Sequence, residues 1–124
     1  MRFKSNKRAR QDRPAIPLRA EFLREHRRCW VCWRGSTEVH EIASGNSFRV
    51  IAFREPCAWF SACTGCNQGP LCDYAQWPIV RQLAIKFVCD RGRFDLVRFN
   101  VDVRGRAAGA ITMEELQPWI DRDR

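Results

Sequence analysis

The chain carries two C-x-x-C pairs, Cys29-Trp30-Val31-Cys32 and Cys63-Thr64-Gly65-Cys66, on either side of the segment Glu38-Val39-His40-Glu41-Ile42. Each pair supplies two thiolates at the spacing that tetrahedral Zn²⁺ accepts. The two pairs therefore predict one structural zinc site that holds the segment between them in place, with the ligands Cys29, Cys32, Cys63 and Cys66. The alternative for either pair is a redox-active dithiol.

The composition narrows the class of protein. The 124 residues are 45% hydrophobic and include five Trp and eight Phe, which indicates one folded domain and not a disordered chain. No apolar run approaches the ~20 residues of a membrane span, and no apolar stretch follows the positive charges of the N-terminus as it would in a secretory signal. We therefore expect a cytoplasmic protein without membrane contact, in which cysteines stay reduced.

The other three cysteines fit the same interpretation. Seven cysteines is an odd count, which suits a disulfide framework badly. Free cysteines are usually buried small apolar residues, and we expect this of Cys57, Cys72 and Cys89. Cys57 or Cys72 is the alternative candidate for a place among the metal ligands.

The net charge of +8 comes from the first quarter of the chain. Residues 1–34 contain eleven Lys and Arg and three acidic residues, whereas residues 35–124 contain eleven of each. A basic segment of this kind binds polyanions through phosphate contacts and counterion release, although a solubilising tail has the same composition. The residues predicted to contact nucleic acid are Lys4, Lys7, Arg8, Arg10, Arg13, Arg49 and Arg54. For Arg49 and Arg54, phosphate binding and a plain solvated face are equally consistent with the sequence.

The N-terminal half is expected to contain an arm, a helix and a hairpin. Residues 1–17 are predicted to be a flexible basic arm, and 18–28 a short amphipathic helix that follows Pro17. Residues 37–42 are predicted to form a strand. Residues 47–53 are rich in β-branched and aromatic side chains, which predicts the second strand of a hairpin.

The distal third is predicted to be mainly helical. Apolar residues at helical spacing, followed by Gly92, predict a helix over 78–91. Residues 94–103 fit either a strand or a helix capped by Asp95. Thr112-Met113-Glu114-Glu115 fits a capping box that opens a last helix, which Pro118 is expected to disturb.

His40 is the candidate for chemistry inside the bracketed segment. A lone histidine is more often structural, but His40 lies on a predicted strand beside Glu41. An imidazole beside a carboxylate can bind a divalent ion or activate a water molecule. Trp30 lies within the first cysteine pair and Trp33 directly follows it, and for both, packing around the metal is favoured over stacking on bases.

The order of these features resembles the HNH endonucleases. The shared order is a cysteine pair, a strand with a central histidine, a hairpin, and a cysteine pair followed at once by an asparagine, here Asn67. The resemblance covers Cys29 to Asn67, about a third of the chain, and residues 77–86 look more weakly like the C-terminal part of phage-encoded members. It implies an α+β protein, bacterial or phage-encoded, with a ββα-metal or treble-clef-like zinc core over 18–75 and a helical extension over 76–124.

The resemblance also implies roles for individual residues. With Ile42 as the anchor, His40 and Asn67 correspond to the ligands of a catalytic Mg²⁺ or Mn²⁺, and Glu41 corresponds to the general base. The family has a histidine at that base position, and a carboxylate with an ordinary pKa near 4.3 is a weaker base. The family also has an asparagine where this chain has Ala58.

An alignment shifted by one residue gives a different set of roles. It makes His40 the base but places Val39 at a ligand position, where an apolar side chain cannot bind a metal. The sequence therefore predicts a divergent HNH-type endonuclease that cleaves DNA. A catalytically inactive zinc module that binds nucleic acid and a zinc-stabilised protein-protein adaptor are the alternatives.

Overall fold

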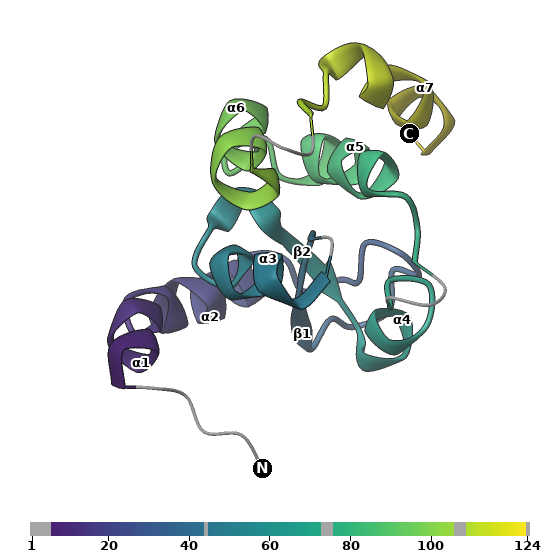
Figure 1. Cartoon of the computed structure of the whole chain (residues 1–124). Helices are drawn as coiled ribbons and strands as arrows, with labels where there is room; N and C mark the ends of the chain where they lie inside the picture. The colour runs from purple at the N-terminus through teal and green to yellow at the C-terminus, as the bar shows by residue number, and fades with distance from the viewer. Residues whose placement is uncertain (1–5, 44, 73–75, 106–108, 124) are drawn as a thin grey trace.

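A two-stranded sheet lies at the centre of a mostly helical structure (Figure 1). The structure is a computed structural model that describes residues 6–43, 45–72, 76–105 and 109–123. Strand β1 (Glu38–Glu41) pairs antiparallel with β2 (Trp59–Ala62), so that His40 lies opposite Phe60. Helix α4 (Thr64–Gln68) follows β2 directly. The predicted α+β class and the strand in 37–42 are therefore confirmed.

The predicted hairpin over 37–53 is wrong. Its second half is helix α3 (Gly45–Ala52), and the 3-10 helix η1 (Pro56–Ala58) then leads into β2. All four residues of β2 are buried, including Trp59 and Phe60, so this segment gains the most by pairing with β1. Periodicity alone does not separate a short apolar strand from a buried helix, and here the longer-range pairing decides.

The expected flexible arm over residues 1–17 is also wrong in the part that the structure describes. Residues from Asn6 onward are helical, in α1 (Asn6–Asp12) and α2 (Ala15–Glu25). Asp12 is only 1% exposed and forms ion pairs with Arg8 at 3.6 Å and with Arg54 at 3.4 Å. The Arg8 pair lies within α1, and the Arg54 pair joins α1 to the segment that follows α3. Helix α2 also begins three residues before the predicted start at residue 18.

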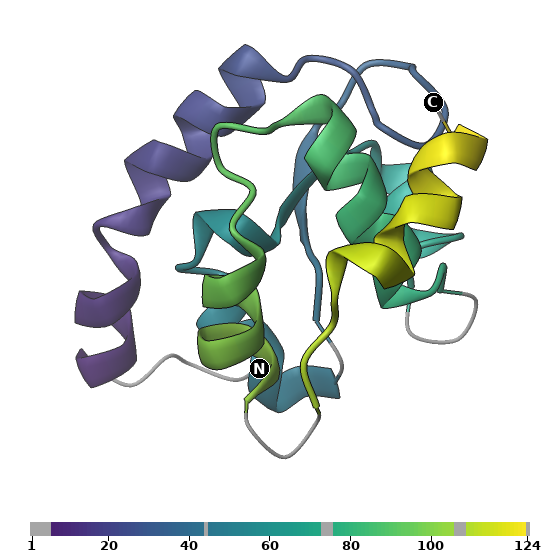
Figure 2. The ribbon, with the colours of Figure 1, turned by 90° about the horizontal axis from the view of Figure 1, so that it is seen from above.

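The C-terminal part contains two long helices that pack against each other (Figure 2). Helix α5 (Ile79–Cys89) confirms the predicted helix, and α7 (Met113–Asp123) lies alongside it. The Thr112 capping box is confirmed, because Glu115 Oε2 accepts from the Thr112 N–H at 2.7 Å. Pro118 lies inside α7 and does not end it. Leu116 and Ile120 are buried on either side of the proline, and their packing holds the helix together.

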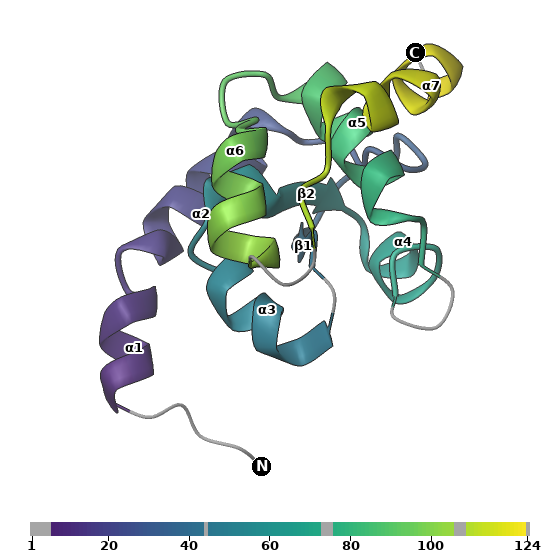
Figure 3. The same ribbon diagram turned by 45° about the horizontal axis from the view of Figure 1, so that its top comes forward.

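Residues 94–103 are helical. They form α6 (Leu96–Arg98) and the π-helical turn η2 (Phe99–Arg104), with Asp95 as the N-cap of α6. The η2 turn packs against α3 and η1 (Figure 3). Buried side chains of α2, β2, α5, η2 and α7 belong to one hydrophobic cluster, so the C-terminal helices share a core with the sheet. None of the helices in the described ranges has the length and apolar character that a membrane crossing requires.

Candidate metal centre and histidine site

The four predicted zinc ligands meet at one place. The Sγ atoms of Cys29, Cys32, Cys63 and Cys66 all lie within 4.8 Å of one another. The Cys32 and Cys63 sulfurs are 3.8 Å apart. Zn–S bonds of about 2.3 Å in a tetrahedral site place sulfurs roughly 3.8 Å apart. The cluster therefore fits a metal ion such as zinc.

Cys57 and Cys72 do not belong to this cluster. Cys57 is buried in the hydrophobic core, and burial raises the pKa of its thiol to about 12. A thiol held in the protonated form in this way is a poor nucleophile. Its position confirms the expectation of a buried apolar residue.

Helix α4 and the turn before it build the second half of the cluster. Cys63 is the N-cap residue of α4, and its sulfur accepts the Cys66 backbone N–H at 3.4 Å. This hydrogen bond lowers the pKa of Cys63 to about 7, whereas burial raises the pKa of Cys66. Four thiolates this close together repel one another, which keeps some of the four thiols protonated. A metal ion that binds to all four sulfurs must therefore displace those protons.

Helix α4 also brings Asn67 to His40, the two residues that the resemblance paired as metal ligands. His40 Nδ1 lies 2.9 Å from Asn67 Oδ1. Asn67 follows the last cysteine directly, so the metal cluster fixes its position relative to β1. His40 itself is only 6% exposed and lies on the buried side of the sheet, edge-on to Phe60.

Gln82 on α5 is a partner of His40 that the sequence analysis missed. His40 Nε2 lies 2.8 Å from Gln82 Oε1, and Gln82 Nε2 donates to the backbone oxygen of Trp77 at 2.8 Å. The second bond orients the amide, so Gln82 presents an acceptor to His40. Burial lowers the pKa of His40, with Gln82 and Asn67 as smaller opposing influences. Both facing atoms are amide oxygens, which only accept, so a neutral His40 donates to one of them and only the protonated ring donates to both.

Glu38 is the second residue that the sequence analysis missed. Its Oε1 accepts from Asn67 Nδ2 at 3.1 Å. Residues two apart on a strand share a face, so Glu38 and His40 both reach Asn67 from β1. This period of two was readable from the sequence and could have identified Glu38. We refer to Glu38, His40, Asn67 and Gln82 as the histidine site.

Glu41 does not reach the histidine site. Adjacent residues on a strand point to opposite faces, and the Glu41 carboxylate forms an ion pair with Arg19 at 3.2 Å. Arg19 also donates to the backbone oxygen of Phe53 at 3.1 Å. Glu41 thus helps to join α2 to the sheet. Ala58, at the position of the family's asparagine, contributes a backbone oxygen that accepts the Ile42 N–H at 2.8 Å.

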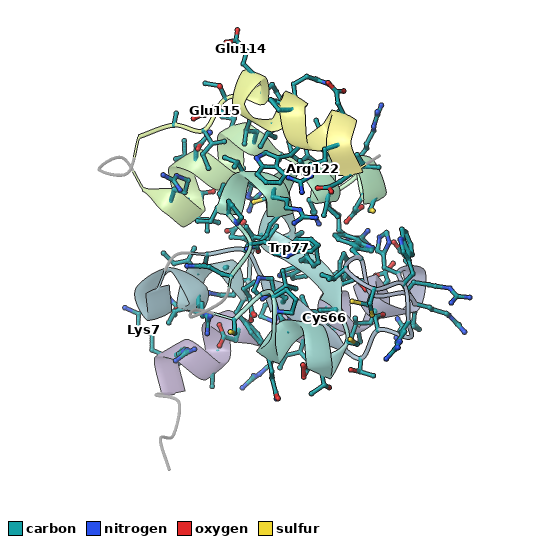
Figure 4. All side chains as sticks on the ribbon, turned by 90° about the vertical axis from the view of Figure 1, so that its right-hand side faces the viewer. Lys7, Cys66, Trp77, Glu114, Glu115 and Arg122 are labelled. Atoms are coloured by element: carbon teal, nitrogen blue, oxygen red, sulfur yellow. The ribbon has the colours of Figure 1, made fainter. Side chains whose placement is uncertain are left out.

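The predicted nucleic-acid contacts fall into three groups. Lys7, Arg10 and Arg13 are exposed on or just after α1, and Figure 4 shows Lys7 to the left of Cys66. Arg8 and Arg54 form the ion pairs with Asp12. Lys4 lies outside the described residues. The positive charge of Arg49 on α3 contributes to lowering the pKa of His40. Arg49 is therefore the predicted nucleic-acid contact that acts on the histidine site.

These features define a mixed α+β protein, mostly helical, with a two-stranded sheet and a four-cysteine cluster that could bind zinc. Within the described ranges, no second group of three or more His, Cys, Asp or Glu side chains is placed to share a metal ion. The histidine site has two such residues, together with two amides. No protein family, curated protein or solved structure matches this chain.

Proposed function

We propose that the protein is a divergent HNH-type endonuclease that cleaves DNA with a divalent metal ion. The observation that carries this proposal is the 2.9 Å contact between His40 Nδ1 and Asn67 Oδ1. Strand β1 supplies the histidine, and the helix that begins at the second cysteine pair supplies the asparagine. A four-cysteine cluster joins the start of α4 to the segment that precedes β1, as the resemblance to the family implies.

The contacts favour a revised set of roles within this proposal. Mg²⁺ prefers oxygen ligands, and the Glu38 carboxylate contacts the Asn67 amide, whose NH₂ faces Glu38 and whose oxygen faces His40. Binding of one ion by both residues therefore requires the Asn67 oxygen to turn away from His40 toward Glu38. Such an ion, when bound, supplies Lewis-acid stabilisation of the phosphate. Burial lowers the pKa of His40, which favours the neutral ring, and with Nε2 donating to Gln82 the Nδ1 atom can take a proton from the attacking water once the Asn67 oxygen has turned away from it. Gln82 orients the imidazole for this step, and Glu41 is left with its contact to Arg19.

His40→Ala is expected to abolish nicking of supercoiled plasmid in Mg²⁺ or Mn²⁺. Loss of a general base typically lowers a rate by about 10²–10⁴-fold. Two variants on the same strand form a matched pair: Glu38→Gln should reduce nicking to a similar extent, and Glu41→Gln should leave it nearly unchanged. Nicking rates and thermal melting are measured for each variant.

Two results would count against these roles. If His40→Ala nicks plasmid as fast as the native protein, the observed activity belongs to a contaminant or to another site. If Glu41→Gln, and not Glu38→Gln, removes activity without lowering the melting temperature, the general base is Glu41 as the resemblance implied.

A second candidate is a catalytically inactive zinc module that binds nucleic acid. The observation in its favour is that His40 is buried and that each of its ring nitrogens already faces an amide oxygen, of Asn67 or of Gln82. This module would use the exposed basic side chains of the N-terminal helix for phosphate contacts. It differs from the endonuclease in binding DNA without nicking it under any metal condition.

Replacing Lys7, Arg10 and Arg13 together with Gln is expected to weaken duplex binding evenly across sequences. Each phosphate contact contributes about one unit to the salt dependence, so the slope of log K against log salt should fall by up to about three. Arg91→Gln, at an exposed arginine beyond the end of α5, is the control. An unchanged slope in the triple variant would place the DNA elsewhere on the surface.

A further inference from the structure

Four tryptophans line a groove between α5, α7 and the first cysteine pair. The groove has a volume of about 450 Å³ and includes Trp30, Trp33, Trp77 and Trp119. Ligand pockets commonly measure about 300–1,000 Å³. Figure 4 shows Trp77 between helix α7, which carries Arg122, and helix α4, which carries Cys66. Neither the metal centre nor the histidine site uses this groove.

Trp33 occupies a backbone conformation that suits glycine. Its φ angle is 63°, in the left-handed region that bulky residues rarely adopt. Trp33 is nevertheless 58% exposed as a whole residue, so burial in the core does not compensate for the strained backbone. A tryptophan at this position therefore indicates a role for the exposed ring itself. Because Trp33 lines the groove, the exposed ring is placed to contact a ligand that enters it.

Arg81 adds a second flat surface to the groove. Its guanidinium lies 3.6 Å from the centre of the Trp77 ring, and two hydrogen bonds of 2.9 and 3.1 Å to Asp123 fix its plane. Aromatic rings and guanidinium planes are the surfaces on which unpaired bases stack. Trp33 and the Trp77–Arg81 stack are thus two such surfaces lining one groove.

The charge beside the groove suits a polyanion. Residues 26–37 contain three exposed arginines, Arg27, Arg28 and Arg34, and no acidic residue. Arg34 follows Trp33 in the chain, and Arg28 donates to the Trp33 backbone oxygen at 3.1 Å. Their positions next to the exposed ring allow phosphates to contact arginine while bases stack on tryptophan. An apolar peptide would use the rings but not these charges.

We propose that the tryptophan groove binds the bases of an unpaired DNA strand. The groove adjoins the histidine site, because Trp77 lines the groove and its backbone oxygen orients Gln82 against His40. If the groove binds an unpaired strand beside the histidine site, the substrate of the protein is DNA with an unpaired strand. This statement about the substrate rests on the proposed endonuclease function. Binding in the groove does not depend on cleavage.

Trp33→Gly separates binding from folding. Glycine adopts a positive φ without strain, so this variant should melt at the native temperature or above it. Its affinity for a 20-nucleotide oligothymidine should fall by about 5- to 150-fold, the effect typical of losing one stacked base. Binding is followed by fluorescence anisotropy of the labelled strand without added Mg²⁺ or Mn²⁺, so that no cleavage is required. Val97→Ala, at a valine that is 75% exposed on α6, is the control and should bind as the native protein does.

Three outcomes would overturn the proposal. They are native affinity in Trp33→Gly, equal affinity of the native protein for the single strand and for a duplex of the same length, and no binding of either. In the last case the groove is left as a surface for a protein partner. Plasmid nicking by the native protein is scored separately, so a failure of the groove proposal is distinguishable from a failure of the endonuclease proposal.

Discussion

Cys66→Ser is expected to unfold the protein, and a strong chelator is expected to do the same to the native chain. Zinc binding contributes about 10–16 kcal/mol in zinc-finger peptides, which is as large as the net stability of a whole domain, about 5–15 kcal/mol. Cys66 lies in α4, and its backbone also bonds Cys63 at the start of that helix. Loss of the cluster should therefore release α4 and with it Asn67.

Circular dichroism during thermal melting, together with metal analysis, tests this expectation. The native protein should contain about one zinc per chain. Cys72→Ser is the matched control, because Cys72 lies outside the cluster and its replacement should preserve both the zinc and the melting temperature. A chain that melts normally after the metal has been removed would show that the hydrophobic cluster alone holds the fold.

The metal centre could be predicted from the sequence because its geometry is imposed by chemistry. Four sulfurs must approach one ion whatever the surrounding fold, so the C-x-x-C spacing at Cys29 and Cys63 carries enough information. The pairing of His40 with Asn67 was expected from the resemblance to the HNH endonucleases, which implied that both residues bind one metal ion. The structure places the two side chains in contact.

The predictions from sequence failed where contacts between residues far apart in the chain determine the local structure. The segment 47–53 has strand-like residues, but β1 pairs with the more deeply buried Trp59–Ala62. Gln82 was missed because it lies 42 residues beyond His40 on a helix whose orientation the sequence does not reveal. The helix at Asn6–Asp12 also depends on a distant partner, because Asp12 is buried against Arg54. The polar composition of residues 6–12 predicted that they are exposed, but the ion pair with Arg54 buries Asp12.

Asp90→Asn is expected to lower the free energy of unfolding by about 3–5 kcal/mol, the typical cost of leaving a buried charge without its partner. Lys86 is 0% exposed, and its Nζ donates to Asp90 Oδ2 at 2.8 Å. The ammonium also lies 5.0 Å from the centre of the Phe22 ring, inside the aromatic core. Burial lowers the pKa of Lys86 to about 8, and the Asp90 carboxylate opposes this shift. Removing the negative charge leaves the ammonium with no compensation for its lost hydration.

The pH dependence of this loss distinguishes the charge effect from altered packing. Between a folded pKa of about 8 and the ordinary value of 10.5, the unfolded chain binds more protons at Lys86 than the folded chain does. The contribution of Lys86 to stability therefore rises with pH in this window. In Asp90→Asn the folded pKa falls further, so the variant should regain part of its lost stability at pH values where the native lysine is still charged.

Urea denaturation of native protein, Asp90→Asn and Lys86→Met at pH 7 and pH 9 measures both effects. Lys86→Met removes the buried charge while retaining most of the side-chain volume. Asp90 then keeps Arg93 at 3.3 Å and His26 at 3.7 Å as neighbours. Lys86→Met should therefore cost less than Asp90→Asn, because no charge is left alone in the core. The reverse order of the two losses would mean that the ammonium, and not its carboxylate partner, is the element that the core requires.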